Sequence, residues 1–95
     1  MSTPPNDVQF RAMADSFIHL ANEHSDSTPH DQVSASLSYA ASRYASFVAF
    51  TRANSQAHFA AGTEEAVRFF VDQFETMLRE NLADHEANFN RYRGQ

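Results

Sequence analysis

Three long stretches of the sequence carry apolar residues at the spacing of an α-helix, and this spacing limits the fold more than any other feature. Residues three, four and seven positions apart share one face of a helix. The stretches run from residue 7 to His24, from Thr28 to about Asn54, and from Thr63 to about Arg93. With two Gly and three Pro among 95 residues, turns are few and the elements must be long. We therefore expect an all-α fold.

The connections between these stretches predict how the helices are arranged. Short links place consecutive helices antiparallel, so we expect an up-down-up three-helix bundle. Residues 54–62, NSQAHFAAG, form either a short extra helical turn or an irregular link. We expect Gly62 to adopt the left-handed backbone that ends such a turn, and Thr63 to cap the third helix. Residues 1–6 are expected to be disordered, and residues 7–93 to form a single helical domain.

Composition excludes several classes of protein. Apolar residues make up 42% of the chain, with nine Phe and three Tyr, which favours a packed core over disorder. The absence of cysteine excludes a disulfide and fits a cytoplasmic protein. No apolar run approaches the roughly 18 residues of a membrane span. The net charge is −5 and the seven arginines are scattered, so we expect no nucleic-acid partner.

The second helix carries small residues on the side opposite its apolar face. Four serines recur at every fourth position there, and aromatic residues flank them. Such a surface is either a solvated back face or a docking face that lets another helix approach closely. On the second interpretation, symmetric pairing gives a homodimer. We call this surface the small-residue face; its predicted interface residues are Ser34, Ser38, Ser42, Ala45, Ser46, Ala49, Tyr39 and Phe50.

Three of the five histidines fall near one end of the predicted bundle. His24 ends the first helix, His30 begins the second, and His85 lies well along the third. These residues are the candidate metal ligands, although the chain has no H-E-x-x-H motif and no Glu-x-x-His pair. The alternative is that the histidines cap helix ends or complete the core with a hydrogen-bonded ring. We predict no cofactor.

The sequence offers no pattern for catalysis. It has no G-x-S-x-G elbow, and almost no glycine with which to build a phosphate-binding loop. Glu64 and Glu65 are better explained as the acidic first turn of a helix than as an acid/base couple. We therefore expect a protein that is not an enzyme.

Three segments resemble the recurring blocks of a small bacterial family that is catalogued only as a domain of unknown function. They read MADSFIHLAN, VSASLSYAASRYASF and FFVDQFETMLRENLADHEANF. The resemblance covers roughly Phe10 to Phe89. It implies a soluble, all-helical bacterial protein, and it carries over no activity, substrate or catalytic residue.

Two hypotheses about function follow from these patterns. The first is a protein–protein interaction module that associates with itself or with another protein through the small-residue face. The second is a metal- or small-ligand-binding protein that uses His24, His30 and His85. The first hypothesis predicts that Ser42→Glu disrupts association while the monomer stays folded.

Overall fold

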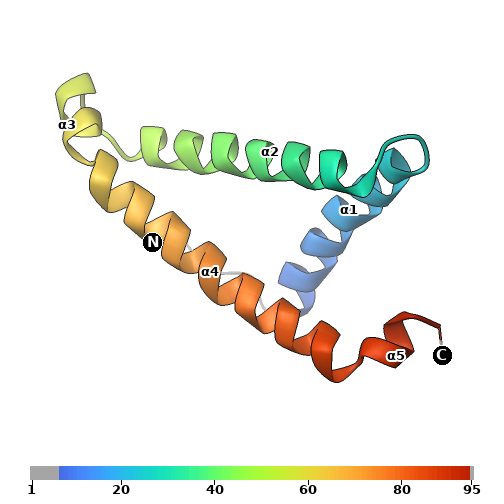
Figure 1. Ribbon diagram of the computed structural model, residues 1–95. Helices are drawn as coiled ribbons and strands as arrows, with labels where there is room; N and C mark the ends of the chain where they lie inside the picture. Colours follow the sequence, from blue (N-terminus) through green and yellow to red (C-terminus); the bar gives the residue numbers. More distant parts are fainter. Residues whose placement is uncertain (1–6, 95) are drawn as a thin grey trace. The chain divides into compact units, whose positions relative to one another are not determined.

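The computed structural model describes residues 7–94, which are helical apart from short connections (Figure 1). No strand occurs in this part of the chain, so the predicted all-α class is confirmed. The predicted disorder of residues 1–6 lies outside the described residues. The helices are α1 (Asp7–Ser25), α2 (His30–Thr51), α3 (Gln56–Ala61), α4 (Thr63–Ala87) and α5 (Phe89–Tyr92).

The chain divides into two compact units, and the division falls within α2. The hairpin unit contains α1 and α2 as far as Tyr44. The C-terminal unit begins at Ala45 and contains the end of α2 together with α3, α4 and α5. The predictions of a single domain and of an up-down-up bundle concern how these units join, and they stay predictions.

In the hairpin unit, a tight turn joins α1 to α2. The N–H groups of Asp26 and Ser27 donate to the last turn of α1, at 3.2 Å each. The Pro29 carbonyl then accepts the N–H groups of Gln32 and Val33 at 3.1 Å, which begins the hydrogen bonding of α2. Proline suits this position because its fixed φ matches a helix start and it has no N–H to satisfy. The helix starts within two residues of the predicted Thr28.

In the C-terminal unit, the alternative of an extra helical turn in residues 54–62 is confirmed by α3. Ser55 is its N-cap, with extended backbone, and the Ser55 hydroxyl accepts the His58 N–H at 3.1 Å. The His58 ring in turn accepts the Asn54 N–H at 3.0 Å. Side-chain capping of this kind supports a helix that is too short to be stable by itself.

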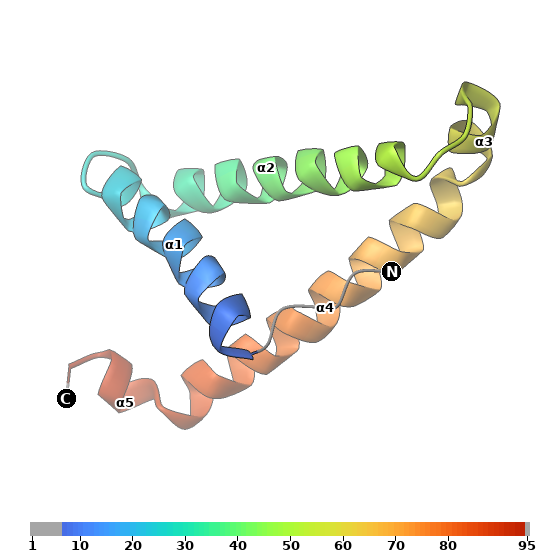
Figure 2. The same cartoon turned by 180° about the vertical axis from the view of Figure 1, so that it is seen from behind.

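Two predictions about the junction between α3 and α4 are wrong. Gly62 has φ −93° and ψ 5°, which is not the left-handed region. Thr63 is the first residue of α4 and not its cap, and its hydroxyl donates back to the Ala60 carbonyl at 3.0 Å. The physical reason is that α3 leads directly into α4 (Figure 2), with Gly62 as the one residue between them. The Ala66 N–H already bonds the Gly62 carbonyl at 3.0 Å. No left-handed residue is needed at such a junction.

The predicted end of the third helix near Arg93 is also wrong, although α4 is the longest of the described helices, as expected. The α4 helix stops at Ala87, and Asn88 has φ −116° and ψ 27°. The Asn88 side chain donates to the Asp84 carbonyl oxygen at 3.1 Å and to Asp84 Oδ1 at 2.9 Å. Asparagine favours a helix end because its amide competes for backbone hydrogen bonds.

Between residues 7 and 94, one side chain is buried, that of Val33 at 9% exposure. Large apolar side chains on all three long helices are more than one-third exposed. Neighbouring atoms can only reduce exposure, so each unit taken alone exposes these side chains at least as much. Neither unit therefore has a core of its own. No helix in the described part of the chain is long and apolar enough to span a bilayer.

Candidate functional site

The hairpin unit contains an apolar groove between α1 and the first half of α2. The space encloses about 450 Å³. Helical spacing brings its apolar lining together, because residues three, four and seven positions apart lie on one side of each helix. We call this space the hairpin groove; its apolar lining residues are Phe17, Leu20, Ala21, Val33, Leu37 and Ala40.

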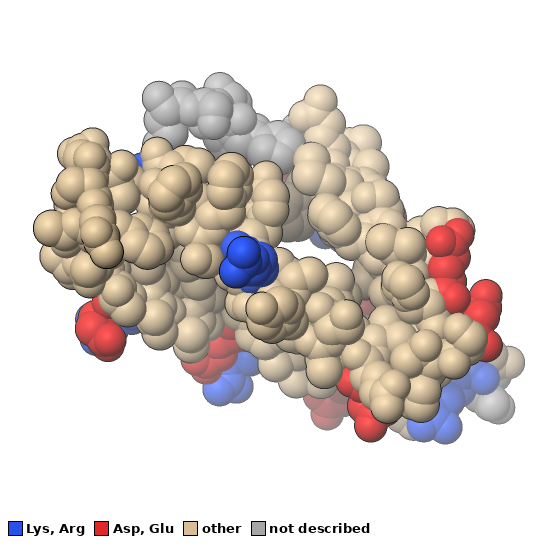
Figure 3. All heavy atoms as spheres, turned by 90° about the horizontal axis from the view of Figure 1, so that it is seen from above, with Lys and Arg blue, Asp and Glu red and all other residues tan. Residues whose placement is uncertain are grey.

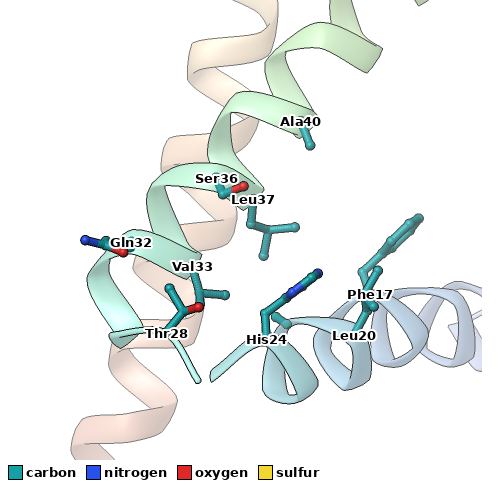
Figure 4. A pocket seen from close by; sticks show the side chains of 10 residues that line it. Phe17, Leu20, His24, Thr28, Gln32, Val33, Ser36, Leu37 and Ala40 are labelled. Carbon is teal, nitrogen blue, oxygen red and sulfur yellow. The ribbon is translucent and has the colours of Figure 1, made fainter. Parts of the chain in front are cut away.

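The side chains of the hairpin groove converge from both helices (Figure 4). Val33 and Leu37 point from α2 toward α1, and Phe17 points from α1 into the same space. The lining is far from covered, since Phe17 is 57% exposed and Leu37 is 37% exposed. An apolar groove that is open to this extent suits a large apolar body such as a helix face better than it suits water.

A polar edge accompanies the apolar lining. His24, Thr28, Gln32 and Ser36 complete the groove. The His24 ring points into the space, whereas the Gln32 side chain points away from it (Figure 4). With histidine neutral, no residue of the groove carries a charge, so an uncharged occupant can enter without breaking an ion pair.

A second apolar surface runs along α4 in the C-terminal unit. We call it the α4 stripe; its residues are Val67, Phe70, Val71, Phe74, Met77, Leu78 and Leu82. Phe74, near its centre, is 55% exposed. The stripe contains no charged residue, although α4 has seven acidic residues and two arginines and so a net charge of −5. The charges lie mainly away from the stripe, as the Arg79–Glu75 ion pair of 2.8 Å illustrates. Uncharged side chains also cover most of the face shown in Figure 3.

The structure places the predicted small-residue face along α2, across the division between the units. Its serines are exposed, and Ala45 and Ala49 are half-buried. The Ser42 hydroxyl donates to the Tyr39 carbonyl of its own helix at 2.8 Å. Phe50 makes an edge-to-face contact with Phe59 of α3, at 6.4 Å between ring centroids. The predicted interface role of this surface stays a prediction.

The three candidate metal ligands belong to different local environments. His24 lines the hairpin groove, and His30 Nδ1 lies 3.2 Å from the Ser25 hydroxyl across the turn. His85, in the C-terminal unit, contacts the Asn81 carbonyl through Nδ1 at 3.0 Å, and its ring lies 4.7 Å from that of Tyr92. Within residues 7–94, no group of three or more His, Cys, Asp or Glu is placed to hold a metal ion. Metal binding stays a prediction.

A polar cluster at the corner between α4 and α5 was missed by the sequence analysis. The Tyr92 hydroxyl donates to Asp84 Oδ2 at 2.6 Å, while Asn88 binds the other carboxylate oxygen. The Tyr92 hydrogen bond is the main cause that lowers the pKa of Asp84; loss of hydration opposes it, and Asn88, His85 and Arg91 add smaller contributions that lower the pKa further. The one available signal was an asparagine four residues after an aspartate near the end of an apolar helical pattern. We call this cluster the C-terminal corner.

Taken together, the helices and their exposed faces define a small all-α protein. The chain belongs to the protein family of unknown function DUF3144, whose model matches residues 10–85. The predicted resemblance to a domain of unknown function is therefore confirmed.

A solved structure supports this membership. The chain is similar to the protein NB7890A from Shewanella sp., whose NMR structure aligns with a TM-score of 0.78 and 30% sequence identity. The alignment covers 98% of this chain and 97% of the Shewanella chain. This relative is bacterial, as the resemblance implied. No curated protein matches the chain significantly.

Proposed function

We propose that this protein is a self-association module, and that its three long helices complete an up-down-up bundle when their apolar faces are covered. One observation carries the proposal: both units expose large apolar side chains along their helices, and Val33 is the one buried side chain among residues 7–94. A chain with 42% apolar residues is stable only if these faces are covered.

The amount of exposed apolar surface supports association. Thirteen large apolar side chains on the faces of α1, α2 and α4 are between 37% and 68% exposed. Six of them belong to the hairpin unit and seven to the C-terminal unit. Each unit therefore presents a row of apolar side chains that another surface must cover. The side chains are Phe10, Met13, Phe17, Leu20, Leu37, Tyr44, Phe47, Val67, Val71, Phe74, Met77, Leu78 and Leu82.

The proposed bundle places these faces against one another. If α4 lies antiparallel to α2, it runs parallel to α1, and the α4 stripe meets the apolar sides of both helices. The same direction brings Asn81 and His85, which follow the stripe, to the end of the hairpin that holds His24. Apolar residues then face apolar residues, and polar residues face polar residues.

Two surfaces of the chain are candidates for contact between copies: the predicted small-residue face and the apolar faces. No observation on the described residues favours metal binding or catalysis, so the proposal includes neither. As in the sequence analysis, we propose an interaction protein that is not an enzyme.

Sedimentation velocity of the full, untagged chain tests the proposal. Over a concentration series from about 1 to 100 μM we expect a dimer or a larger assembly, because association covers apolar faces that would otherwise remain in water. A chain that stays monomeric and folded over the whole series contradicts self-association.

A further inference from the structure

We propose that the connection between α2 and α4 is a pH-sensitive switch, which is helical while the His58 ring is neutral and unwinds when that ring takes up a proton. We call residues 54–61 the α3 link; they comprise the capping residues Asn54 and Ser55 and the helix α3. The α3 link lies within the C-terminal unit, so its response to pH needs no second chain and goes beyond the proposed self-association.

The hydrogen bonds at the start of the α3 link resemble a capping box in which a histidine stands in the place of the usual glutamate or glutamine. In a capping box, the side chain of the N-cap residue binds the N–H of the third helical residue, whose own side chain reaches back to the cap. Here the Ser55 hydroxyl accepts the His58 N–H at 3.1 Å. The His58 ring reaches back one residue further, and its Nδ1 accepts the Asn54 N–H at 3.0 Å.

The bond from Asn54 fixes the protonation state of the His58 ring. A backbone N–H can only donate, so Nδ1 must offer a lone pair and the ring hydrogen must lie on Nε2. A protonated ring carries a hydrogen on both nitrogens, and Nδ1 then turns a donor toward the Asn54 N–H. Histidine changes its charge between about pH 5 and 8, so acidification within this range removes the bond.

His85, in the same unit, provides the contrast. Its Nδ1 lies 3.0 Å from the Asn81 carbonyl oxygen. A carbonyl oxygen can only accept, so this Nδ1 carries a hydrogen, and protonation of the ring at Nε2 leaves the bond in place. The direction of one hydrogen bond therefore makes the contact of His58 sensitive to pH and that of His85 insensitive.

No ion pair offsets a proton on His58. The neighbouring elements carry Arg52, just after α2, and Glu64, Glu65 and Arg68 in the first turns of α4. Within residues 7–94, none of these side chains forms an ion pair with His58. A proton on the His58 ring therefore gains no partner that would replace the lost bond.

The α3 helix depends on its cap more than a longer helix would, since six residues are too few for a helix to be stable by itself. Two further contacts attach it to its neighbours. Phe59 packs edge to face on Phe50 of α2, at 6.4 Å between ring centroids, and the Thr63 hydroxyl of α4 donates to the Ala60 carbonyl at 3.0 Å. Unwinding releases both contacts and lets the six residues extend from about 9 Å to as much as about 20 Å.

An NMR titration of the full chain tests the switch with two substitutions at His58. The Cα chemical shifts of residues 56–61 give the ratio of helical to unwound link. Between about pH 7.5 and 5.0 we expect this ratio to fall about fivefold in the original chain, which is the effect of losing one helix cap. His58→Gln keeps an acceptor at every pH, so its ratio should change less than about twofold. His58→Ala has no acceptor, so its ratio should be about fivefold lower already at the higher pH.

Two results of the titration overturn the switch. One is a constant ratio in the original chain while the His58 ring takes up its proton. The other is a fall of the same size in His58→Gln, because a different group would then be responsible.

A second measurement needs no substitution and remains informative if the variants do not fold. The ¹⁵N chemical shifts of the imidazole nitrogens show which nitrogen of a neutral ring carries the hydrogen. At about pH 8 we expect it on Nε2 of His58 and on Nδ1 of His85. A hydrogen on Nδ1 of His58 overturns the switch, since the ring could not then accept the Asn54 N–H. A chain that is monomeric in sedimentation contradicts self-association and leaves the switch standing.

Discussion

The hairpin unit and the C-terminal corner hold their helices in opposite ways. In the hairpin unit, apolar side chains converge on a groove that they do not fill, and Val33 is the one buried side chain among residues 7–44. At the C-terminal corner, exposed polar groups satisfy one another: Asp84 accepts hydrogen bonds from Tyr92 and Asn88 at 2.6 and 2.9 Å. The C-terminal corner is held by residues within eight positions of one another along the chain. The apolar side chains of the hairpin groove are covered only if a surface from outside the hairpin packs on them.

This difference indicates where stability should depend on association. Exposed polar bonds contribute little to global stability, but they define where an element ends. Apolar faces contribute far more, but only after another surface covers them. The effect on stability of a substitution in the hairpin groove or the α4 stripe should therefore depend on protein concentration. The effect of a substitution at the C-terminal corner should not.

The largest expected effect comes from Phe74→Ala in the α4 stripe. If the stripe is covered in the assembly, the replacement should cost about 3–5 kcal/mol in the free energy of unfolding per chain, because it removes a large side chain from a packed site. Urea denaturation at a fixed protein concentration measures the cost. Phe69→Ala is the matched control on the opposite side of α4, and it should cost about 1 kcal/mol, since Phe69 loses mainly its ring contact with Phe70 at 5.1 Å. Equal costs for the two variants would contradict burial of the stripe.

A smaller effect is expected from Val33→Ala at the base of the hairpin groove. Removal of two buried carbon groups should cost about 1–2 kcal/mol. The control is Val8→Ala in α1, where the side chain is 78% exposed and the change should stay within about 0.5 kcal/mol. Thermal denaturation of both variants at matched concentration gives the comparison. A Val8 effect as large as that of Val33 would show that the groove base does not hold the hairpin together.

At the C-terminal corner, Tyr92→Phe should raise the pKa of Asp84 toward its ordinary value, since the replacement removes the hydroxyl that favours the carboxylate. A carboxyl with a lowered pKa in the folded state stabilises the protein above pH 3.8, the ordinary value, and this contribution is lost as pH falls through the lowered pKa. As the pH falls below 3.8, the Tyr92→Phe variant should therefore lose less stability than the original chain. NMR titration of the Asp84 carboxyl measures the shift, with Tyr39→Phe as the control. An unchanged titration would mean that the hydroxyl does not bond Asp84 in solution.

The smallest effect is expected from Ser42→Glu on the small-residue face. If the groove and the α4 stripe carry the association, the dimer dissociation constant should change by less than about threefold, because an exposed surface substitution typically costs under about 0.5 kcal/mol. The hypothesis of a small-residue interface predicts the opposite, namely dissociation to folded monomers. Sedimentation velocity therefore separates the two surfaces with one variant. Ser46→Ala, which adds no charge, serves as the control.

The helices were largely predictable because apolar periodicity identifies the apolar side of a helix from local sequence alone. The start of α2 follows from Pro29, whereas the sequence of residues 54–62 allowed either a helical turn or an irregular link, and α3 is the first of these. The end of α4 was not predictable in this way, since it depends on an Asn88 side chain that bonds Asp84 while the helical pattern continues through Phe89 and Tyr92. Gly62 was assigned the wrong backbone because a glycine after a helix usually marks a reversal.

The candidate site was predictable only in part. The periodicity places Phe17, Leu20 and Leu37 on apolar faces, and the groove is built from those faces. However, a period of 3.6 residues shows which side of a helix is apolar, and it contains no information on which surface covers that side. The histidines illustrate the same point, because proximity to one end of a bundle does not determine their contacts. His30 contacts Ser25 and His85 contacts Asn81, each within five residues along the chain.

The most direct test of the account is an isotope-filtered NOE experiment on a mixture of ¹³C-labelled and unlabelled chains. The filter passes only contacts between different chains. We predict NOEs from the apolar side chains of α1, α2 or α4 in one chain to apolar side chains of the other chain. If such NOEs are absent from the filtered spectrum and present in the uniformly labelled protein, each chain covers its own apolar faces and self-association through them is contradicted.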